Sequence, residues 1–191
     1  NAFGNNNFCT ELDDLELVIK WIKTKYPNCK VSLFGHSRGG AISILKSNEN
    51  NQIDKVISWA SPSNLISRLP DADKARRWKD TNVVYVYNGR TKQNMPMFYQ
   101  FYQNCIENIE RLNIKKAIKE INIPHLHIHG SSDPTVLIED ALEMKRWNDK
   151  INLEIINEAD HVFGSSHPYN KNKFPLHLNK ALLKTLEFLK S

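Results

Sequence analysis

Apolar residues near the start of the chain recur every three or four positions. The repeating positions are Leu12, Leu15, Ile19 and Ile22. This spacing places the apolar side chains on one face of a helix. Thr10 and Asp13 have the spacing of a capping box, and Pro27 cannot continue a helix. The pattern therefore predicts an amphipathic helix that begins near Thr10 and ends before Pro27.

Short stretches rich in apolar residues farther along the chain have the length of buried strands. They occupy residues 30–34, 55–60, 126–129 and 153–156. Helical patterns lie between or after these runs. Pro134 suits the start of a helix that carries Ala141, Leu142 and Met144, and a last helix has Leu178, Leu182, Leu186 and Leu189 on one face. Alternating strands and helices predict an α/β fold, in which a mostly parallel sheet has helices on both faces.

The connection after the second strand, residues 61–124, is too long for a plain crossover. We therefore predict one domain over residues 1–191 with a cap inserted at about 62–123. Inside it, residues 83–87 followed by Asn88-Gly89 predict a hairpin with a two-residue type I′ turn.

An aromatic cluster follows this hairpin in the sequence. Its members are Phe98, Tyr99, Phe101 and Tyr102. They form either the apolar wall of an acyl pocket or the core of the cap itself. We favour the core.

The composition fits a globular domain with a sizeable core, because 40% of the 191 residues are hydrophobic and 25% are charged. Lys and Arg (26) outnumber Asp and Glu (21), but they are scattered. Their densest group, Lys115, Lys116 and Lys119, is interpreted as a solvated helix surface. No apolar run reaches the roughly 20 residues of a membrane helix. We therefore expect neither nucleic acid nor a membrane as a partner.

The three cysteines, Cys9, Cys29 and Cys105, have neither paired nor metal-like spacing. Their odd number argues against a complete disulfide framework. This favours a reducing, cytoplasmic compartment. Residues 1–7 have no signal-peptide pattern.

A possible nucleophile lies where the first strand runs into a helix. Gly35-x-Ser37-x-Gly39 follows a buried strand and precedes an apolar helical segment. A serine on such a sharp turn needs small neighbours, and the turn lifts its hydroxyl clear of the sheet. We predict that Ser37 is a nucleophile. The Arg38 N–H at the helix start is the expected donor to a developing oxyanion.

A serine hydroxyl needs a base to take its proton. His161 is the best candidate, because it follows the strand at 153–156 and a short turn, where a loop returns over the carboxyl edge of the sheet. His167 is the second choice.

The base in turn needs a carboxylate at another strand end near the same edge. Asp133 follows the strand at 126–129 and the turn Gly130-Ser131-Ser132. Asp160 is less suitable, because side chains adjacent in sequence seldom reach each other in this geometry. The order Ser37, Asp133, His161 is that of α/β-hydrolases.

Three histidines, His125, His127 and His129, alternate along one strand and share one face. Such a comb suggests a metal site, but no carboxylate or cysteine with ligand spacing supports it. We expect packed, hydrogen-bonded histidines and no metal.

Three stretches of the chain resemble the α/β-hydrolase superfamily, particularly its dienelactone hydrolase and prolyl-oligopeptidase-like branch of serine esterases and peptidases. They are residues 31–40 (VSLFGHSRGG), 124–136 (PHLHIHGSSDPTV) and 159–164 (ADHVFG). The resemblance implies that Ser37 is the nucleophile, Asp133 the acid, His161 the base and Arg38 one oxyanion donor.

Members of this superfamily carry further strands before the helix that begins here near Thr10. The resemblance implies that these strands, and a second oxyanion donor in a His-Gly loop, are missing from residues 1–9. Gly4 is the one residue there suited to a turn near the site. Loss of one donor typically costs about 10²- to 10³-fold in turnover.

These residues predict a serine hydrolase that cleaves a carboxylic ester, thioester or short amide through an acyl-enzyme. Its partner is a small-molecule substrate, and no metal or organic cofactor is implied. Two alternatives stay open: a catalytically inactive truncated hydrolase or assembly module, and an acyltransferase that uses the same three residues.

Overall fold

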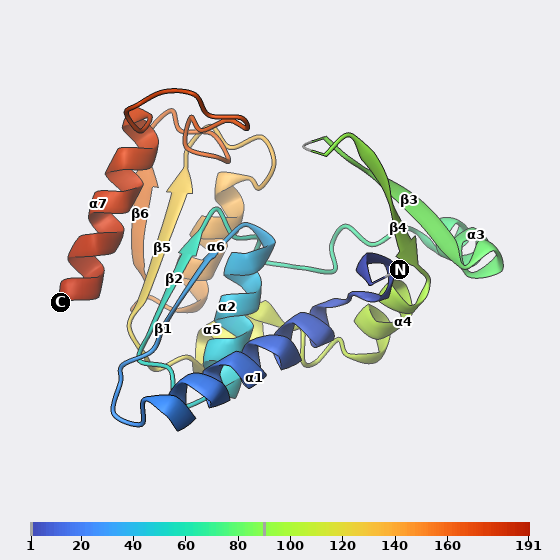
Figure 1. Ribbon diagram of the computed structural model, residues 1–191, viewed down its shortest axis with the longest axis horizontal. Helices are drawn as coiled ribbons and strands as arrows, with labels where there is room; N and C mark the ends of the chain where they lie inside the picture. Colours follow the sequence, from blue (N-terminus) through green and yellow to red (C-terminus); the bar gives the residue numbers. More distant parts are fainter. Residues whose placement is uncertain (1, 90) are drawn as a thin grey trace.

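The computed structural model describes residues 2–89 and 91–191. Its elements in chain order are η1 (Phe3–Asn5), α1 (Phe8–Lys25), β1 (Ser32–His36), α2 (Arg38–Glu49), β2 (Lys55–Trp59), α3 (Ala72–Thr81), β3 (Val83–Asn88), β4 (Gln93–Phe98), α4 (Gln100–Glu107), α5 (Ile114–Glu120), β5 (His125–Gly130), α6 (Ile138–Trp147), β6 (Asn152–Ile156) and α7 (Leu176–Lys190). Figure 1 shows the sheet with its helices on one side of the molecule and the β3–β4 hairpin on the other.

The four apolar runs form one parallel sheet in the order β1-β2-β5-β6. Gly35 lies opposite Ser58, and Ser58 lies opposite His127. Since all four strands run the same way, their carboxyl ends share one edge, which is the upper edge of the sheet in Figure 1. Turns that follow these strands therefore meet at this edge.

Helices cover both faces of the sheet, as the alternation of elements predicts. On one face α1, α2, α5 and α6 pack over a core that includes Ile44, Val56 and Met144. On the other face α7 packs over a second core that includes Ile57 and Ala181. The two layers are separate in Figure 1, where α7 lies alone on its side of the sheet.

The structure corrects three predicted boundaries. The first helix begins at Phe8 rather than near Thr10, because the Asn7 side chain caps it by accepting a hydrogen bond from the Thr10 N–H. The strand expected at 30–34 is shifted to Ser32–His36, since the Val31 N–H is bound by a carboxylate of Asp54.

The third correction concerns the helix expected to start at Pro134, which instead begins at Ile138. The residues between them form a turn in which the Asp133 carboxylate accepts from the N–H groups of Thr135 and Val136, at 2.8 and 3.0 Å. A side chain that satisfies nearby backbone donors in this way offers the chain an alternative to helix.

The packed face of α7 also differs from the predicted leucine face. Leu178 and Leu182 pack into the second core, but Leu186 and Leu189 are exposed. The buried positions farther along are Ala181 and Thr185, and the Thr185 hydroxyl accepts from the Trp59 indole N–H at 3.0 Å. A small residue and a hydroxyl let α7 approach the sheet closely, which leucine periodicity alone does not show.

The segment between β2 and β5, residues 60–124, contains the predicted hairpin, but its turn is longer than predicted. β3 and β4 pair from Val83–Phe98 to Asn88–Gln93, so more than two residues separate the paired strands. The prediction of a two-residue type I′ turn at Asn88-Gly89 is therefore wrong. The Asn88 carbonyl accepts from the Lys92 N–H, and the positive φ of 55° falls at Lys92.

The aromatic cluster is the core of this segment, as favoured above. Trp78 of α3 packs against the rings of Tyr99, Phe101 and Tyr102. Phe101 also contacts Phe8 of α1 edge-on, with ring centroids 5.0 Å apart. These contacts join the segment to the first core.

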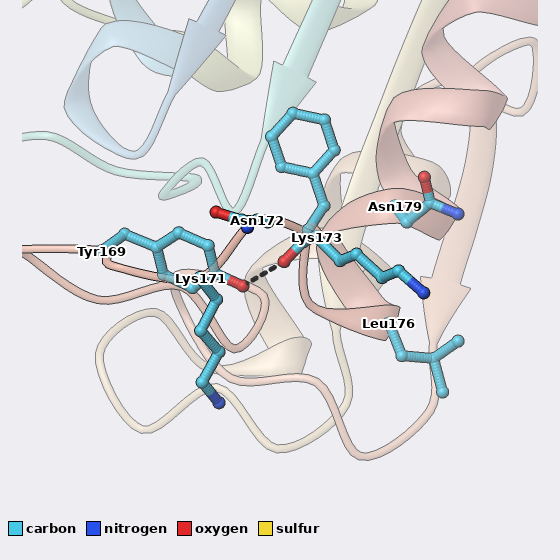
Figure 2. Close-up of a pocket in the computed structure, with 7 residues that line it drawn as sticks. Tyr169, Lys171, Asn172, Lys173, Leu176 and Asn179 are labelled. Atoms are coloured by element: carbon cyan, nitrogen blue, oxygen red, sulfur yellow. Dashed lines mark hydrogen bonds between the residues drawn. The ribbon is translucent and has the colours of Figure 1, made fainter.

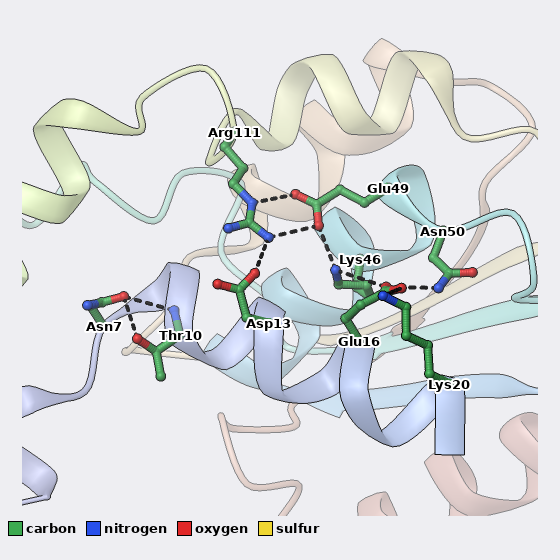
Figure 3. Close-up of polar contacts among 9 residues, drawn as sticks. All are labelled: Asn7, Thr10, Asp13, Glu16, Lys20, Lys46, Glu49, Asn50 and Arg111. Atoms are coloured by element: carbon green, nitrogen blue, oxygen red, sulfur yellow. Dashed lines mark hydrogen bonds and ion pairs between the residues drawn. The ribbon is translucent and has the colours of Figure 1, made fainter. Parts of the chain in front are cut away.

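A buried lysine ties α1 to α2 (Figure 3). Lys46 is 3% exposed, and its ammonium lies 2.7 Å from Glu49 and 3.4 Å from Glu16 of α1. Arg111, in the turn before α5, binds both Glu49 and Asp13 of α1. A buried ammonium needs such partners, because leaving it unpaired costs several kcal/mol.

Within the described ranges, no helix combines the length and the apolar character needed to cross a membrane. The cysteines are free thiols; Cys9 and Cys105 are buried. Burial raises the pKa of the Cys105 thiol to about 12.

Candidate active site

Ser37 lies at the tight turn between β1 and α2. Its backbone has φ 55° and ψ −125°, a conformation that L-residues rarely adopt. The Ser37 N–H donates to the Trp59 carbonyl at 2.8 Å, which anchors the turn to β2. Backbone strain of this kind persists only where the surroundings fix it, and here it presents the hydroxyl at the carboxyl edge of the sheet.

The two outer glycines of this turn have different roles. A Cβ on Gly35 would overlap the Gly39 carbonyl, whereas a Cβ on Gly39 meets no atom within 4 Å. The prediction that Ser37 needs small neighbours therefore holds at Gly35 and not at Gly39.

This difference predicts opposite effects for two alanine substitutions. Gly35→Ala is expected to lower the free energy of unfolding by about 3 kcal/mol or more, because the clash is with backbone that cannot move aside. Gly39→Ala is expected to raise it by about 0.4–1 kcal/mol, since alanine restricts the unfolded chain and Gly39 lies in a helix. Urea unfolding measures both, and equal stabilities would contradict this account of the turn.

The structure brings together the three residues singled out from the sequence. His161 Nε2 lies 3.0 Å from Ser37 Oγ, and His161 Nδ1 lies 2.7 Å from Asp133 Oδ2. The Asp133 side chain is fully buried, and that of His161 is 16% exposed. Since the buried carboxylate accepts from Nδ1–H, Nε2 is left as the acceptor that faces the serine hydroxyl.

The acid and the base meet because their loops pack together. A Cβ on Gly130 would overlap the Ala159 carbonyl, so only glycine permits this approach of β5 to the turn after β6. The Ser132 N–H donates to the same Ala159 carbonyl at 3.0 Å. The Asp133 and His161 side chains are therefore set by backbone contacts between the two loops.

The two second-choice residues have other positions. Asp160 caps its own loop, where Oδ1 accepts from the N–H groups of Val162 and Gly164 at 3.2 and 2.7 Å. His167 lines a surface hollow with Val162 and Ser165, whereas the imidazole bonded to Ser37 is that of His161.

One residue that the sequence analysis did not single out also holds the base. His36 Nε2 lies 2.7 Å from the His161 carbonyl, so the imidazole N–H donates to the backbone of the base. The two rings are tilted with centroids 4.8 Å apart. His36 directly precedes Ser37, but the serine motif does not specify this position, and its hydrogen-bond partner lies 125 positions away in the sequence.

Arg38 acquires a side-chain role that the sequence left unassigned. Its guanidinium lies 2.7 Å from Glu11 of α1 and over the Phe8 ring. Its backbone N–H is the first amide of α2, and the first amides of a helix have no partner within the helix. Gly4, considered for a turn near the site, packs against Phe98 of the hairpin instead.

The three histidines of β5 are packed and hydrogen-bonded, as expected. His125, His127 and His129 are 4%, 0% and 0% exposed, on the face of the sheet opposite α7. Ser58 Oγ lies 2.8 Å from His125 Nε2 and 2.7 Å from His127 Nδ1. No group of three or more histidine, cysteine or acidic side chains in residues 2–89 and 91–191 is arranged to hold a metal.

A hollow of about 570 Å³ lies along the loop before α7 (Figure 2). It is lined by Tyr169, Lys171, Asn172, Lys173, Phe174, Leu176 and Asn179. The Tyr169 hydroxyl closes this loop by donating to the Lys173 carbonyl at 2.5 Å. Ser37 and His161 are not among the lining residues, so this hollow is separate from the contacts of the candidate site.

The parallel sheet, the strained turn at Ser37 and the two loops that follow β5 and β6 define an α/β-hydrolase fold. Neither a family model nor a curated protein sequence matches this chain. Solved structures match over nearly its whole length. An α/β-hydrolase, GrgF from a Penicillium species, is 16% identical with a TM-score of 0.67, and the match covers 97% of this chain and 72% of that chain.

Two further solved structures are similar to this chain. Est1E from Butyrivibrio proteoclasticus, solved with ferulic acid bound, is 15% identical with a TM-score of 0.71, over 98% of this chain and 71% of that chain. A monoacylglycerol lipase from Paleococcus ferrophilus is 15% identical with a TM-score of 0.68, over 98% of this chain and 77% of that chain. At these identities the likeness shows the fold, and the predicted fold class is confirmed.

Proposed function

We propose that this protein is a serine hydrolase that cleaves a small carboxylic ester, thioester or short amide through an acyl-enzyme. The observation that carries the proposal is the hydrogen-bonded line from Ser37 Oγ through His161 to the buried Asp133. The fold shared with esterases and a lipase supports an ester over other substrates.

Each of the three groups has one role in the proposed reaction. Ser37 Oγ attacks the carbonyl carbon as its proton passes to His161 Nε2, and Asp133 stabilises the imidazolium. The tetrahedral intermediate collapses, and the leaving group departs with the proton from Nε2. Water then attacks the acyl-enzyme by the same route, which releases the acid and restores the Ser37 hydroxyl.

The first amide of α2 supports the charge that develops on the substrate oxygen. The Arg38 N–H follows the nucleophile directly, and the helix dipole favours negative charge there. The ion pair between Arg38 and Glu11 balances the guanidinium nearby. We propose the Arg38 N–H as one oxyanion donor.

Three finer assignments also remain proposals. The dienelactone hydrolase and prolyl-oligopeptidase-like branch rests on the three quoted motifs. Additional strands beside β1 are favoured by its place at the sheet edge. A cap role for the β2–β5 segment is favoured by the β3–β4 hairpin, which leans toward the sheet in Figure 1.

The proposed nucleophile is tested by intact-mass analysis after exposure to a fluorophosphonate. One adduct is expected on the wild-type chain and none on Ser37→Ala. Ser166→Ala, in the exposed loop after His161, is the matched control and should be labelled like the wild type. A folded wild-type chain that stays unlabelled would contradict hydrolase activity of these 191 residues, and an adduct that persists in Ser37→Ala would contradict the assignment of Ser37.

A further inference from the structure

A continuous hydrogen-bonded chain runs through the buried face of β5 and ends in the loop of Asp133. It passes from His125 to Ser58, from Ser58 to His127, and from His127 Nε2 to His129 Nδ1 at 3.2 Å. His129 Nε2 then lies 2.9 Å from the Val136 carbonyl. All these side chains are buried, so solvent does not interrupt the chain.

The hydrogen-bonded chain fixes the position of the proton on each neutral imidazole, because its last member, the Val136 carbonyl, can only accept. The Val136 carbonyl requires an N–H at His129 Nε2, and in a neutral imidazole this leaves Nδ1 as an acceptor. That acceptor requires an N–H at His127 Nε2, so His127 Nδ1 must accept from the Ser58 hydroxyl. The Ser58 oxygen must then accept from His125 Nε2–H. Three neutral imidazoles joined in this way all carry their proton on Nε2.

Two independent observations agree with this assignment. The deduction leaves His125 Nδ1 as a bare acceptor, and it is one of three buried side-chain atoms without a partner in the part of the chain described. Burial also lowers the pKa of His125 to about 3 and that of His127 well below its ordinary value, which keeps both rings neutral.

The end of the chain meets the carboxylate that orients His161. His129 Nε2 lies 3.6 Å from Asp133 Oδ2, the same oxygen that accepts from His161 Nδ1. It also binds the carbonyl of Val136, whose own N–H donates to Asp133 Oδ1. One imidazole N–H thus holds the turn that carries Asp133 and lies near the Asp133 oxygen that accepts from His161.

We propose that His129 is a positioning residue for Asp133, and that the hydrogen bonds from Ser58 to His127 and from His127 to His129 keep its Nε2–H directed at the Val136 carbonyl. This inference deepens the proposed function and rests on it for its consequence in catalysis. Burying these polar side chains costs desolvation free energy that leucine or isoleucine at the same positions would not. A role in holding Asp133 explains why polar residues occupy this part of the core.

The tautomers of ¹⁵N-labelled histidine, read by NMR, test the proposal without relying on activity. In the wild type, His125, His127 and His129 are expected to be protonated on Nε2 and His161 on Nδ1. A wild-type His129 protonated on Nδ1 would overturn the proposal. Because this readout needs no turnover, it still decides the inference if the wild type fails to react with a fluorophosphonate and the proposed function fails.

Substitutions at the two end histidines of the hydrogen-bonded chain, His125 and His129, separate an effect on positioning from an effect on core packing. His129→Leu is expected to turn His161 from a single Nδ1–H tautomer into a mixture. It is also expected to slow fluorophosphonate labelling about 10- to 100-fold, which is the loss that follows removal of a residue hydrogen-bonded to a metal ligand. His125→Leu is the matched control: the same change on the same buried face, it leaves Ser58 free to donate to His127. It should change neither readout.

Two amide variants keep the test decisive if His129→Leu does not fold. The Gln side chain of His129→Gln reaches the position of Nε2 and should restore both readouts. The shorter side chain of His129→Asn does not reach the Val136 carbonyl and should behave like His129→Leu. Equal effects of His125→Leu and the His129 variants, or a His161 tautomer unchanged in His129→Asn, would overturn the proposal.

Discussion

Replacing Asp133 by asparagine is expected to lower the turnover number for an ester substrate about 10⁴-fold while the fold persists. The amide oxygen can still accept from the N–H groups of Thr135 and Val136, so the turn before α6 keeps its bonds. The amide nitrogen, however, faces His161 Nδ1 as a donor. It forces the imidazole into the tautomer whose Nε2 carries the proton, and that ring cannot take one from Ser37.

The measurement is the turnover number on a p-nitrophenyl ester, with urea unfolding to verify that the fold is intact. Asp160→Asn is the matched control, because its side chain accepts only from backbone N–H groups and an amide oxygen can do the same. A folded Asp133→Asn variant with nearly wild-type turnover would refute the assignment of Asp133 as the acid. A comparable loss of turnover in Asp160→Asn would show that Asp133 is not the only carboxylate on which the base depends, and would contradict its assignment as the acid.

The buried histidines predict an unusually steep loss of stability in mild acid. His125 and His127 are neutral in the folded protein because burial lowers the pKa of each, to about 3 for His125. In the unfolded chain both imidazoles have a pKa of about 6.5. The unfolded state therefore binds more protons below that pH, and the free energy of unfolding falls as the pH falls.

Each of these two imidazoles contributes about 1.4 kcal/mol per pH unit once the unfolded chain is protonated. Their combined slope is about 2.7 kcal/mol per unit between pH 5.5 and 4.5, which is large beside a total stability of about 5–15 kcal/mol. Urea unfolding in this window measures the slope. His125→Leu is expected to halve the slope, and an unchanged slope would show that His125 is protonated in the folded protein.

Much of the fold was predictable from the sequence, because strands and helices buried against a core have a repeating pattern. The runs at 55–60 and 126–129 became β2 and β5 with small shifts. What the pattern does not contain is the side chain that ends or delays an element. Asn7 moves the start of α1, and Asp133 delays α6 until Ile138.

The candidate site shows the same division. Ser37 belongs to a local motif, and Asp133 and His161 follow strands whose carboxyl ends must meet at one edge, so the sequence identified all three. Their catalytic roles remain predictions. The contacts of His36 and the order of the histidine chain depend on pairs of residues far apart in the sequence, and no local pattern encodes such a pair.

Helix α1 carries several polar contacts to other elements along its first half. Asn7, at its start, donates to Gln100 of α4; Glu11 binds Arg38 beside Ser37; Asp13 binds Arg111; and Glu16 binds Lys46. A helix of 18 residues is a stiff rod about 27 Å long. Helix α1 therefore contacts both the hairpin side of the molecule, through Gln100, and the residue that follows Ser37, through Glu11.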